Sequence, residues 1–182
     1  TATSIKNELA IKRLFLLPCY EPVHKGSLKY SSDQRIKMLS LAIEDFSELE
    51  IDSREILRGG SSYMIDTLKE LVDIYKKDTI CLIIGMDSFV NFKTWRQWDK
   101  FSDFVHMIIL PRTGFQPSNK NLGTFNVADD IDQLRSKPNG LLYFSHSELI
   151  DISSSEIRGK IASNQNLDNL LPSSVINFLQ KI

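Results

Sequence analysis

The sequence predicts an α/β fold in which a mostly parallel sheet is flanked by helices. Short apolar runs that end at proline or glycine recur along the chain, as expected of strands buried in a parallel sheet. Segments of roughly 10 to 16 residues with helical spacing of their apolar positions separate these runs. Strands that alternate with such helices are typical of βαβ units. We therefore expect a Rossmann-like layered fold of a single domain over residues 1–182, with a small helical part from about 153 to 182.

The N-terminal half contains two apolar runs with strand character and three segments with helical spacing. The run at residues 14–17 ends at Pro18 and predicts a strand buried on both faces. Serines at helix starts are favourable N-caps. In chain order we expect a helix over residues 1–10, a strand over 14–17, a helix from Ser31 or Ser32 to about Phe46, a strand over Leu49–Ile51, and a helix opened by Ser61 or Ser62 after a break at Gly59 and Gly60.

The C-terminal half contains the strongest strand signal, the β-branched run at residues 80–84, which Gly85 ends. Further apolar runs end at Pro111 and near Ser145. The expected elements are a strand over 80–84, short helices over 86–92 and 95–101, a strand over 105–110, a surface loop over 115–126, a short helix over 129–135, a strand over Leu141–Phe144, and a helix over 153–162. We expect Pro172 to lie in the first turn of a last helix. This C-terminal tail should pack through Leu170, Val175, Phe178 and Leu179.

Charge and composition argue against several classes of protein. Of 182 residues 42% are apolar and 25% charged, and 22 Lys plus Arg balance 23 Asp plus Glu to a net charge of −1, so no global field favours nucleic acid or an anionic membrane. No apolar run approaches the roughly 18 residues of a membrane span, and the N-terminus lacks signal-peptide features. Cys19 and Cys81 suit core positions in a reducing compartment. We expect a cytoplasmic protein.

Ligands of open α/β sheets bind beyond the carboxyl ends of the strands, where this sequence places charged and aromatic residues. His24 and Lys25 follow the first strand on a proline-stiffened loop that suits an anion. A solvated turn is the alternative. Asp87 and Trp95 follow the strand at 80–84, and Arg112 follows the strand at 105–110, where it can pair with a carboxylate or phosphate or simply be solvated.

A run of three serines followed by an arginine marks the start of the helix at residues 153–162. Ser153, Ser154 and Ser155 lie where free backbone N–H groups and the helix dipole favour anions. Arg158, one turn later, can reach the same anion. An ordinary serine N-cap is the alternative to a phosphate site.

The remaining tryptophan and histidines carry weaker signals. We expect Trp98 to lie in the core and Trp95 to be free for stacking. His106 lies within an apolar strand and is expected to be a hydrogen-bonded core residue, whereas His146 lies in a strand-end loop without an identifiable partner. No Walker-type loop, GxGxxG, GxSxG or zinc-spaced Cys/His cluster is present in the sequence. The pattern indicates an α/β enzyme that binds the phosphates of a nucleotide at a helix N-terminus.

A set of segments gives the sequence a family resemblance. In order they are PCYEPVHK, SSDQRIKMLSLAI, REILRGGSSYMIDTL, IIGMDSFVNFKTWRQW, PRTGF, ISSSEIR and LPSSVINFL. Together they resemble the bacterial nicotinate-nucleotide adenylyltransferases, over essentially residues 14–182. ISSSEIR is shared by several nucleotidyltransferases of this fold, whereas SSYMIDTL followed by IIGMDSF and FKTW is specific to the nicotinate mononucleotide branch.

The resemblance implies transfer of AMP from ATP to nicotinate mononucleotide, which gives deamido-NAD and pyrophosphate. Mg²⁺ would be held mainly by phosphate oxygens, so no metal-ligating side chains are expected. Trp95 would stack on the pyridine ring, and the backbone at Tyr63 and Met64, with Arg112, would frame its carboxylate and phosphate. The implied site residues are Lys25 and Arg158 for catalysis; His24, Lys25, Gly85, Ser153, Ser154, Ser155 and Arg158 for ATP; and Cys19, Tyr63, Met64, Asp87, Trp95 and Arg112 for the mononucleotide.

The sequence departs from the family pattern in three ways. Met64 stands where the family usually has Thr, and Cys19 where many members have Asn. The family's GxFDPxHxGH loop and the strand before it are not among these 182 residues, so we expect roughly two dozen residues to precede Thr1 and little activity without them.

Other readings stay open at this point. They are another nucleotidyltransferase, such as one acting on phosphopantetheine, and a non-catalytic nucleotide-binding module. Oligomeric state and the choice between nicotinate and nicotinamide mononucleotide also stay open.

Overall fold

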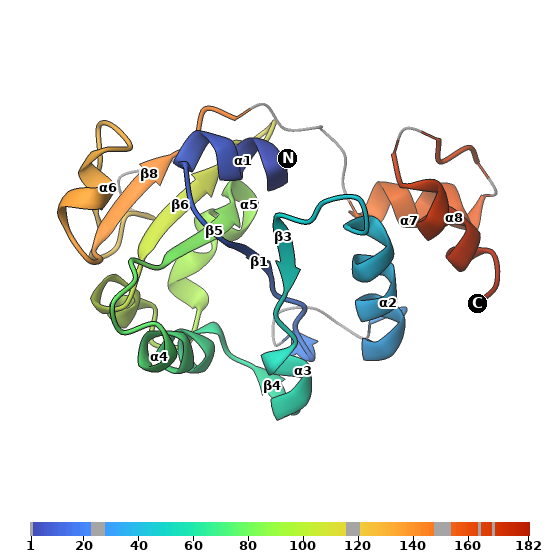
Figure 1. Ribbon diagram of the computed structural model, residues 1–182, viewed down its shortest axis with the longest axis horizontal. Coiled ribbons are helices and arrows are strands. Elements are labelled where there is room, and N and C mark those ends of the chain that lie inside the picture. The colour runs from blue at the N-terminus through green and yellow to red at the C-terminus, as the bar shows by residue number, and fades with distance from the viewer. Residues whose placement is uncertain (1, 23–27, 116–120, 148–153, 164, 169) are drawn as a thin grey trace. The chain divides into compact units, whose positions relative to one another are not determined.

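The computed structural model folds into two compact units with parallel sheets (Figure 1). Unit 1 comprises chiefly Thr3–Ala10 and Tyr63–Leu149, and unit 2 comprises chiefly Ile11–Ser62 and Ile150–Ile182. Every strand pair in the described part of the chain is parallel, which confirms the predicted α/β class. The structure describes residues 2–22, 28–115, 121–147, 154–163, 165–168 and 170–182. Within these ranges no helix is both long and apolar enough to cross a membrane.

Unit 1 is built on a four-stranded parallel sheet in the order β5-β6-β8-β7. The strands are β5 (Cys81–Gly85), β6 (His106–Leu110), β8 (Leu141–Phe144) and β7 (Asn126–Val127). The first three confirm strands predicted from the sequence. The short edge strand β7 was missed, because it begins at the end of the segment expected to be a surface loop; within that segment Phe125 is buried.

Short helices surround this sheet. They are α1 (Ala2–Leu9), α4 (Met64–Ile74), α5 (Met86–Val90), the 3₁₀ helices η1 (Phe92–Thr94) and η2 (Trp98–Asp103), and α6 (Gln133–Ser136). The helix expected over 1–10 is confirmed, and it buries Ile5 and Leu9. The short helix expected over 129–135 begins later, at Gln133.

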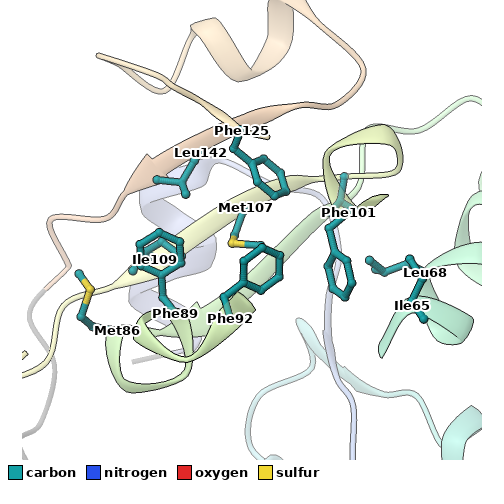
Figure 2. Close-up of a cluster of buried hydrophobic side chains, with 11 residues drawn as sticks. Ile65, Leu68, Met86, Phe89, Phe92, Phe101, Met107, Ile109, Phe125 and Leu142 are labelled. Atoms are coloured by element: carbon teal, nitrogen blue, oxygen red, sulfur yellow. The ribbon is translucent and has the colours of Figure 1, made fainter. Parts of the chain in front are cut away.

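The core of unit 1 is a continuous cluster of apolar side chains from the sheet and these helices. Figure 2 shows Phe89 and Phe92 pointing toward Ile109 and Met107 of β6. Phe92 packs edge-on against Phe101, with ring centroids 5.1 Å apart. Edge-to-face aromatic packing of this kind adds to the stabilisation from burial, so the core fixes the segment between β5 and β6 firmly against the sheet.

The described residues of unit 2 form two small parallel strand pairs and four helices. Strand β1 (Leu14–Leu16) pairs with β3 (Leu49–Ile51), Leu14 lying opposite Leu49. Both strands were predicted, but β1 is only half-buried rather than buried on both faces. The other elements are β2 (Glu21–Pro22) paired with β4 (Ser61–Ser62), and helices α2 (Ser32–Ala42), α3 (Arg54–Arg58), α7 (Ser154–Ala162) and α8 (Ser173–Leu179).

Helix α2 starts where its cap predicts and ends early. The Ser31 hydroxyl accepts from the Gln34 amide at 3.2 Å, and the Gln34 side chain accepts from the Ser31 amide at 2.9 Å, which forms a capping box. The helix ends at Ala42 rather than near Phe46. Helix α8 begins after Pro172, which is its N-cap rather than a first-turn residue, and Ser174 donates to the Leu41 carbonyl at 3.2 Å.

The helix expected to open at Ser61 or Ser62 begins later, at Met64, with Tyr63 as its N-cap. The two serines form β4 instead. The Ser62 hydroxyl accepts from the Tyr20 amide at 2.8 Å, so it is engaged by the residue that precedes β2 rather than by a helix start.

Candidate functional site

Two predicted site residues meet at the carboxyl edge of the unit 1 sheet. Strands β5 and β6 are neighbours with Gly85 opposite Leu110, so the residues that follow them emerge side by side. An Arg112 Nη atom donates to a carboxylate oxygen of Asp87 at 2.7 Å. Both side chains are about two-thirds buried, at 35% and 39% exposure. Because the pair is partly shielded from water, its ionic interaction is stronger than that of a fully exposed pair. The pair presents a carboxylate and a guanidinium together.

Gly85 makes room for this ion pair. A Cβ atom at this position would lie 2.6 Å from an Asp87 carboxylate oxygen, which is too close for any other residue without a shift of that carboxylate. The φ angle of Gly85 is −75°, so its backbone conformation does not require glycine, and the close Asp87 carboxylate is the constraint at this position. Its predicted contact with ATP stays a prediction.

The two tryptophans are not one core residue and one free residue, as the sequence suggested. Both are half-buried at the margin of the hydrophobic core. Trp95 packs edge-on against Phe92 and Phe101, with centroid distances of 5.7 and 6.0 Å, and so is not a free side chain. Trp98 also packs against Phe92, at 6.4 Å, but it is not fully in the core. The core thus holds Trp95 in a fixed orientation while part of its surface stays accessible.

Tyr63 lies near a cation that sequence reasoning missed. The Arg96 guanidinium carbon lies 4.7 Å from the centre of the Tyr63 ring, and an Arg96 nitrogen lies 3.7 Å from an Asp66 carboxylate oxygen. Tyr63 and Met64 begin α4, and both pack at the margin of the core. The only sequence signal for Arg96 was its position directly after Trp95.

The described residues predicted to bind ATP phosphates, which are Ser154, Ser155 and Arg158, belong to unit 2. Ser154 and Ser155 open α7 and are exposed. Arg158 donates to the Ser155 hydroxyl at 3.0 Å, so the structure brings together two members of the predicted set. His24, Lys25 and Ser153 lie outside the described residues.

Cys19 takes part in an arrangement built around Arg35, a residue that sequence reasoning missed. Arg35 of α2 donates to the carbonyls of Cys19 and Tyr20 at 2.5 and 3.1 Å, and to the Ser32 hydroxyl at 3.3 Å. Its Nε atom is buried and has no hydrogen-bond partner among the described residues. Arg35 therefore holds the segment that follows β1.

His106 is a structural residue, as predicted. It is fully buried; its Nδ1 accepts from the Leu141 amide at 3.0 Å, and its Nε2 lies 3.0 Å from the Lys137 carbonyl. The first contact requires an unprotonated Nδ1, so Nε2 carries the hydrogen. Burial lowers the pKa of His106, although hydrogen bonds to backbone groups oppose the shift. The Cys81 thiol is also inert, since burial raises its pKa to about 11.

A carboxylate on α1 organises the loop after β8. Glu8 accepts hydrogen bonds from the Ser145 hydroxyl at 2.6 Å, from the His146 and Ser147 amides at 3.0 and 3.1 Å, and from the Ser147 hydroxyl. Burial raises the pKa of Glu8, but the hydrogen bonds, with one from Tyr143, outweigh it, and the pKa lies below its ordinary value. His146 therefore does have a partner, through its backbone.

Comparisons with known proteins identify the family. A family model described as cytidylyltransferase-like matches residues 1–160. A probable nicotinate-nucleotide adenylyltransferase of Vesicomyosocius okutanii is 41% identical over 181 residues, covering 100% of this chain and 86% of the relative. One of Psychromonas ingrahamii is 36% identical, covering 99% of this chain and 86% of the relative.

Solved structures agree in fold. The nicotinic acid mononucleotide adenylyltransferase of Plasmodium falciparum, complexed with NaAD, has a TM-score of 0.73 at 16% identity, covering 99% of this chain and 85% of its own. A putative nicotinate-nucleotide adenylyltransferase from Vibrio parahaemolyticus has a TM-score of 0.64 at 14% identity, covering 97% and 86%. By its matches in sequence, the chain belongs to the nicotinate-nucleotide adenylyltransferases within the cytidylyltransferase-like family.

Proposed function

We propose that this protein transfers the adenylyl group of ATP to nicotinate mononucleotide, with deamido-NAD and pyrophosphate as products. The observation that carries the proposal is the Asp87–Arg112 pair at the carboxyl edge of the sheet, in a chain 41% identical to a named nicotinate-nucleotide adenylyltransferase. This edge is where open α/β sheets bind ligands. The pair offers an acceptor for hydroxyl groups and a donor for phosphate, which a mononucleotide carries together.

The reaction forms a bond between a phosphate oxygen of the mononucleotide and the α-phosphorus of ATP. The bond from that phosphorus to the oxygen bridging it to the β-phosphate breaks, and pyrophosphate leaves. Such chemistry needs positioning and charge neutralisation more than covalent help from the protein. Arg112 would hold the mononucleotide, with Tyr63, Met64, Trp95 and Cys19 lining its site. Lys25 and Arg158, with His24, Gly85 and the serines Ser153, Ser154 and Ser155, would hold ATP.

Mg²⁺ belongs to this proposal as a companion of the ATP phosphates. Across the described part of the chain, no group of three or more His, Cys, Asp and Glu side chains could hold a metal ion. Mg²⁺ is commonly bound through substrate phosphates and few protein ligands, and we infer that mode of binding here. When bound, it would neutralise charge on the pyrophosphate.

A cytoplasmic location and a single nucleotidyltransferase domain complete the proposal. The free thiols of Cys19 and Cys81 suit a reducing compartment. A net charge of −1 offers no attraction for nucleic acid. We take ATP and nicotinate mononucleotide as the partners.

The test is a product assay on the protein expressed from its complete reading frame. Incubation with ATP, Mg²⁺ and nicotinate mononucleotide should release pyrophosphate and yield deamido-NAD, separated by chromatography. Omission of the mononucleotide is the blank, and 4′-phosphopantetheine replaces it in a parallel reaction. Faster product formation with phosphopantetheine would assign a different acceptor, and no pyrophosphate with any acceptor would favour a nucleotide-binding module.

A further inference from the structure

Arg96 is a cation held beside two segments of the proposed mononucleotide site. It follows Trp95 directly in the chain, and its guanidinium carbon lies 4.7 Å from the centre of the Tyr63 ring. A guanidinium stacked on an aromatic face gains a cation–π interaction, which limits the orientations of this long side chain. Arg96 therefore connects the segment expected to stack on the pyridine ring with the segment expected to frame its carboxylate.

The charge of Arg96 is only weakly compensated. Its contact with Asp66 is 3.7 Å long, and the two side chains are 52% and 40% exposed. Ion pairs of this length and exposure contribute little, because water screens them and the side chains lose conformational freedom. A guanidinium in this state keeps N–H donors for a further carboxylate, which it can bind in a bidentate manner.

We propose that Arg96 is a specificity residue that favours nicotinate mononucleotide over nicotinamide mononucleotide. The inference rests on the proposed function. The two substrates differ at one group, a carboxylate in the first and a neutral amide in the second. A nearby cation attracts the carboxylate by charge and offers the amide only an ordinary hydrogen bond. Asp66 opposes this preference, because its negative charge partly cancels that of Arg96.

The experiment measures kcat/KM for both mononucleotides with the complete enzyme. Arg96→Gln should lower the ratio of nicotinate to nicotinamide efficiency by roughly five- to tenfold, the size expected for loss of one charge-assisted contact. Arg96→Lys keeps the charge and should retain most of the ratio. Asp66→Asn should raise the ratio.

Lys93 supplies a matched control. Its ammonium lies 5.1 Å from the centre of the Trp98 ring, so it is also a cation stacked on an aromatic ring of the same segment. Lys93→Gln should leave the ratio unchanged. A fall of similar size in this variant would mean that general electrostatics, rather than Arg96, sets the preference.

The outcomes separate this inference from the proposed function. If wild-type enzyme adenylylates neither mononucleotide, the proposed function fails. If it adenylylates them and Arg96→Gln alters both efficiencies equally, the function stands and the role of Arg96 is overturned. Arg96 is exposed, so we expect this variant to fold; if it does not, an unchanged ratio in Asp66→Asn overturns the inference by itself.

Discussion

Unit 1 contains nearly all of the buried apolar residues that the structure describes, whereas unit 2 contains only two of them. Among the described residues, the buried apolar side chains belong to unit 1 apart from Leu49 and Val175. In unit 1 the aromatic core fixes the segment that carries Asp87 and Trp95. In unit 2 the described helices α2 and α7 have no fully buried residue.

The difference shows two ways to position functional groups. Unit 1 positions Trp95 by packing against Phe92 and Phe101, and it adds one ion pair, in which Asp87 orients Arg112. Unit 2 uses polar contacts between chain segments, of which Arg35 is the clearest case. Regions with few buried apolar contacts open at lower free energy, so we expect unit 2 to respond more strongly to ligand than unit 1.

The largest expected effect is loss of an aromatic ring from the core of unit 1. Phe92→Ala should lower the free energy of unfolding by about 3–5 kcal/mol, since the ring is fully buried and its removal leaves a cavity. Phe46→Ala in unit 2 is the matched control: this ring is 42% exposed, and its loss should cost under about 1 kcal/mol. Urea denaturation of both variants measures the contrast, and equal losses would break the comparison between the units.

A smaller loss of stability is expected when Arg35 of unit 2 is replaced. Arg35→Ala removes the donors to the Cys19 and Tyr20 carbonyls and should lower the free energy of unfolding by about 2–3 kcal/mol. Arg35→Lys can restore one of these contacts and should recover part of the loss. The account of unit 2 is wrong if the alanine variant is as stable as wild type.

A polar contact within unit 1 is made by Glu8, and the effect of replacing this residue should depend on pH. Glu8→Gln should cost about 1–2 kcal/mol at pH 7, because an amide cannot accept all the hydrogen bonds that the carboxylate accepts. The pKa of Glu8 is lowered in the folded protein, so its stabilisation is present above the ordinary value of 4.5 and is lost as pH falls through the folded pKa. The wild-type advantage in denaturation should therefore shrink below pH 4.5; a constant difference would contradict this.

The smallest effect concerns His106. Its pKa is lowered by burial, so the unfolded chain binds a proton more readily, and stability should be complete above the ordinary value of 6.5 and fall as pH drops below it. Denaturation at pH 7.5 and 5.5 tests this, with His106→Gln as the control that removes the dependence. A wild-type protein that gains stability on acidification, relative to this variant, would refute the assignment.

Hydrophobic periodicity predicted strands β6 and β8 of unit 1 well, because their apolar runs are mostly buried and have clear ends in the sequence. It failed where local and tertiary contacts compete. Ser62 looks like a helix cap, but the Tyr20 amide, 42 residues away, engages its hydroxyl. Helix α3 was not expected at all. Local sequence patterns carry no information on contact partners that lie far away in the sequence.

The same limit applies to the candidate site. Because the carboxyl ends of neighbouring parallel strands meet, the sequence placed Asp87 and Arg112 in one region, but not as an ion pair. Trp95 is partly buried because it packs against Phe101, six residues later in the chain. The chain between them turns at Gln97, whose φ angle is 54°, and no pattern in the sequence predicted this turn. Arg35 and Arg96 were missed because each works through a partner from another element.

The central claim is a division of roles, in which Trp95 of unit 1 acts on the mononucleotide and Arg158 of unit 2 acts on the triphosphate. Steady-state kinetics of Trp95→Ala and Arg158→Ala in the complete enzyme, with each substrate varied in turn, tests it most directly. Trp95→Ala should raise KM for nicotinate mononucleotide by about tenfold or more, the loss of one stacking contact, with little change for ATP. Arg158→Ala should impair turnover and ATP use instead. Equal defects toward both substrates in either variant would contradict the division.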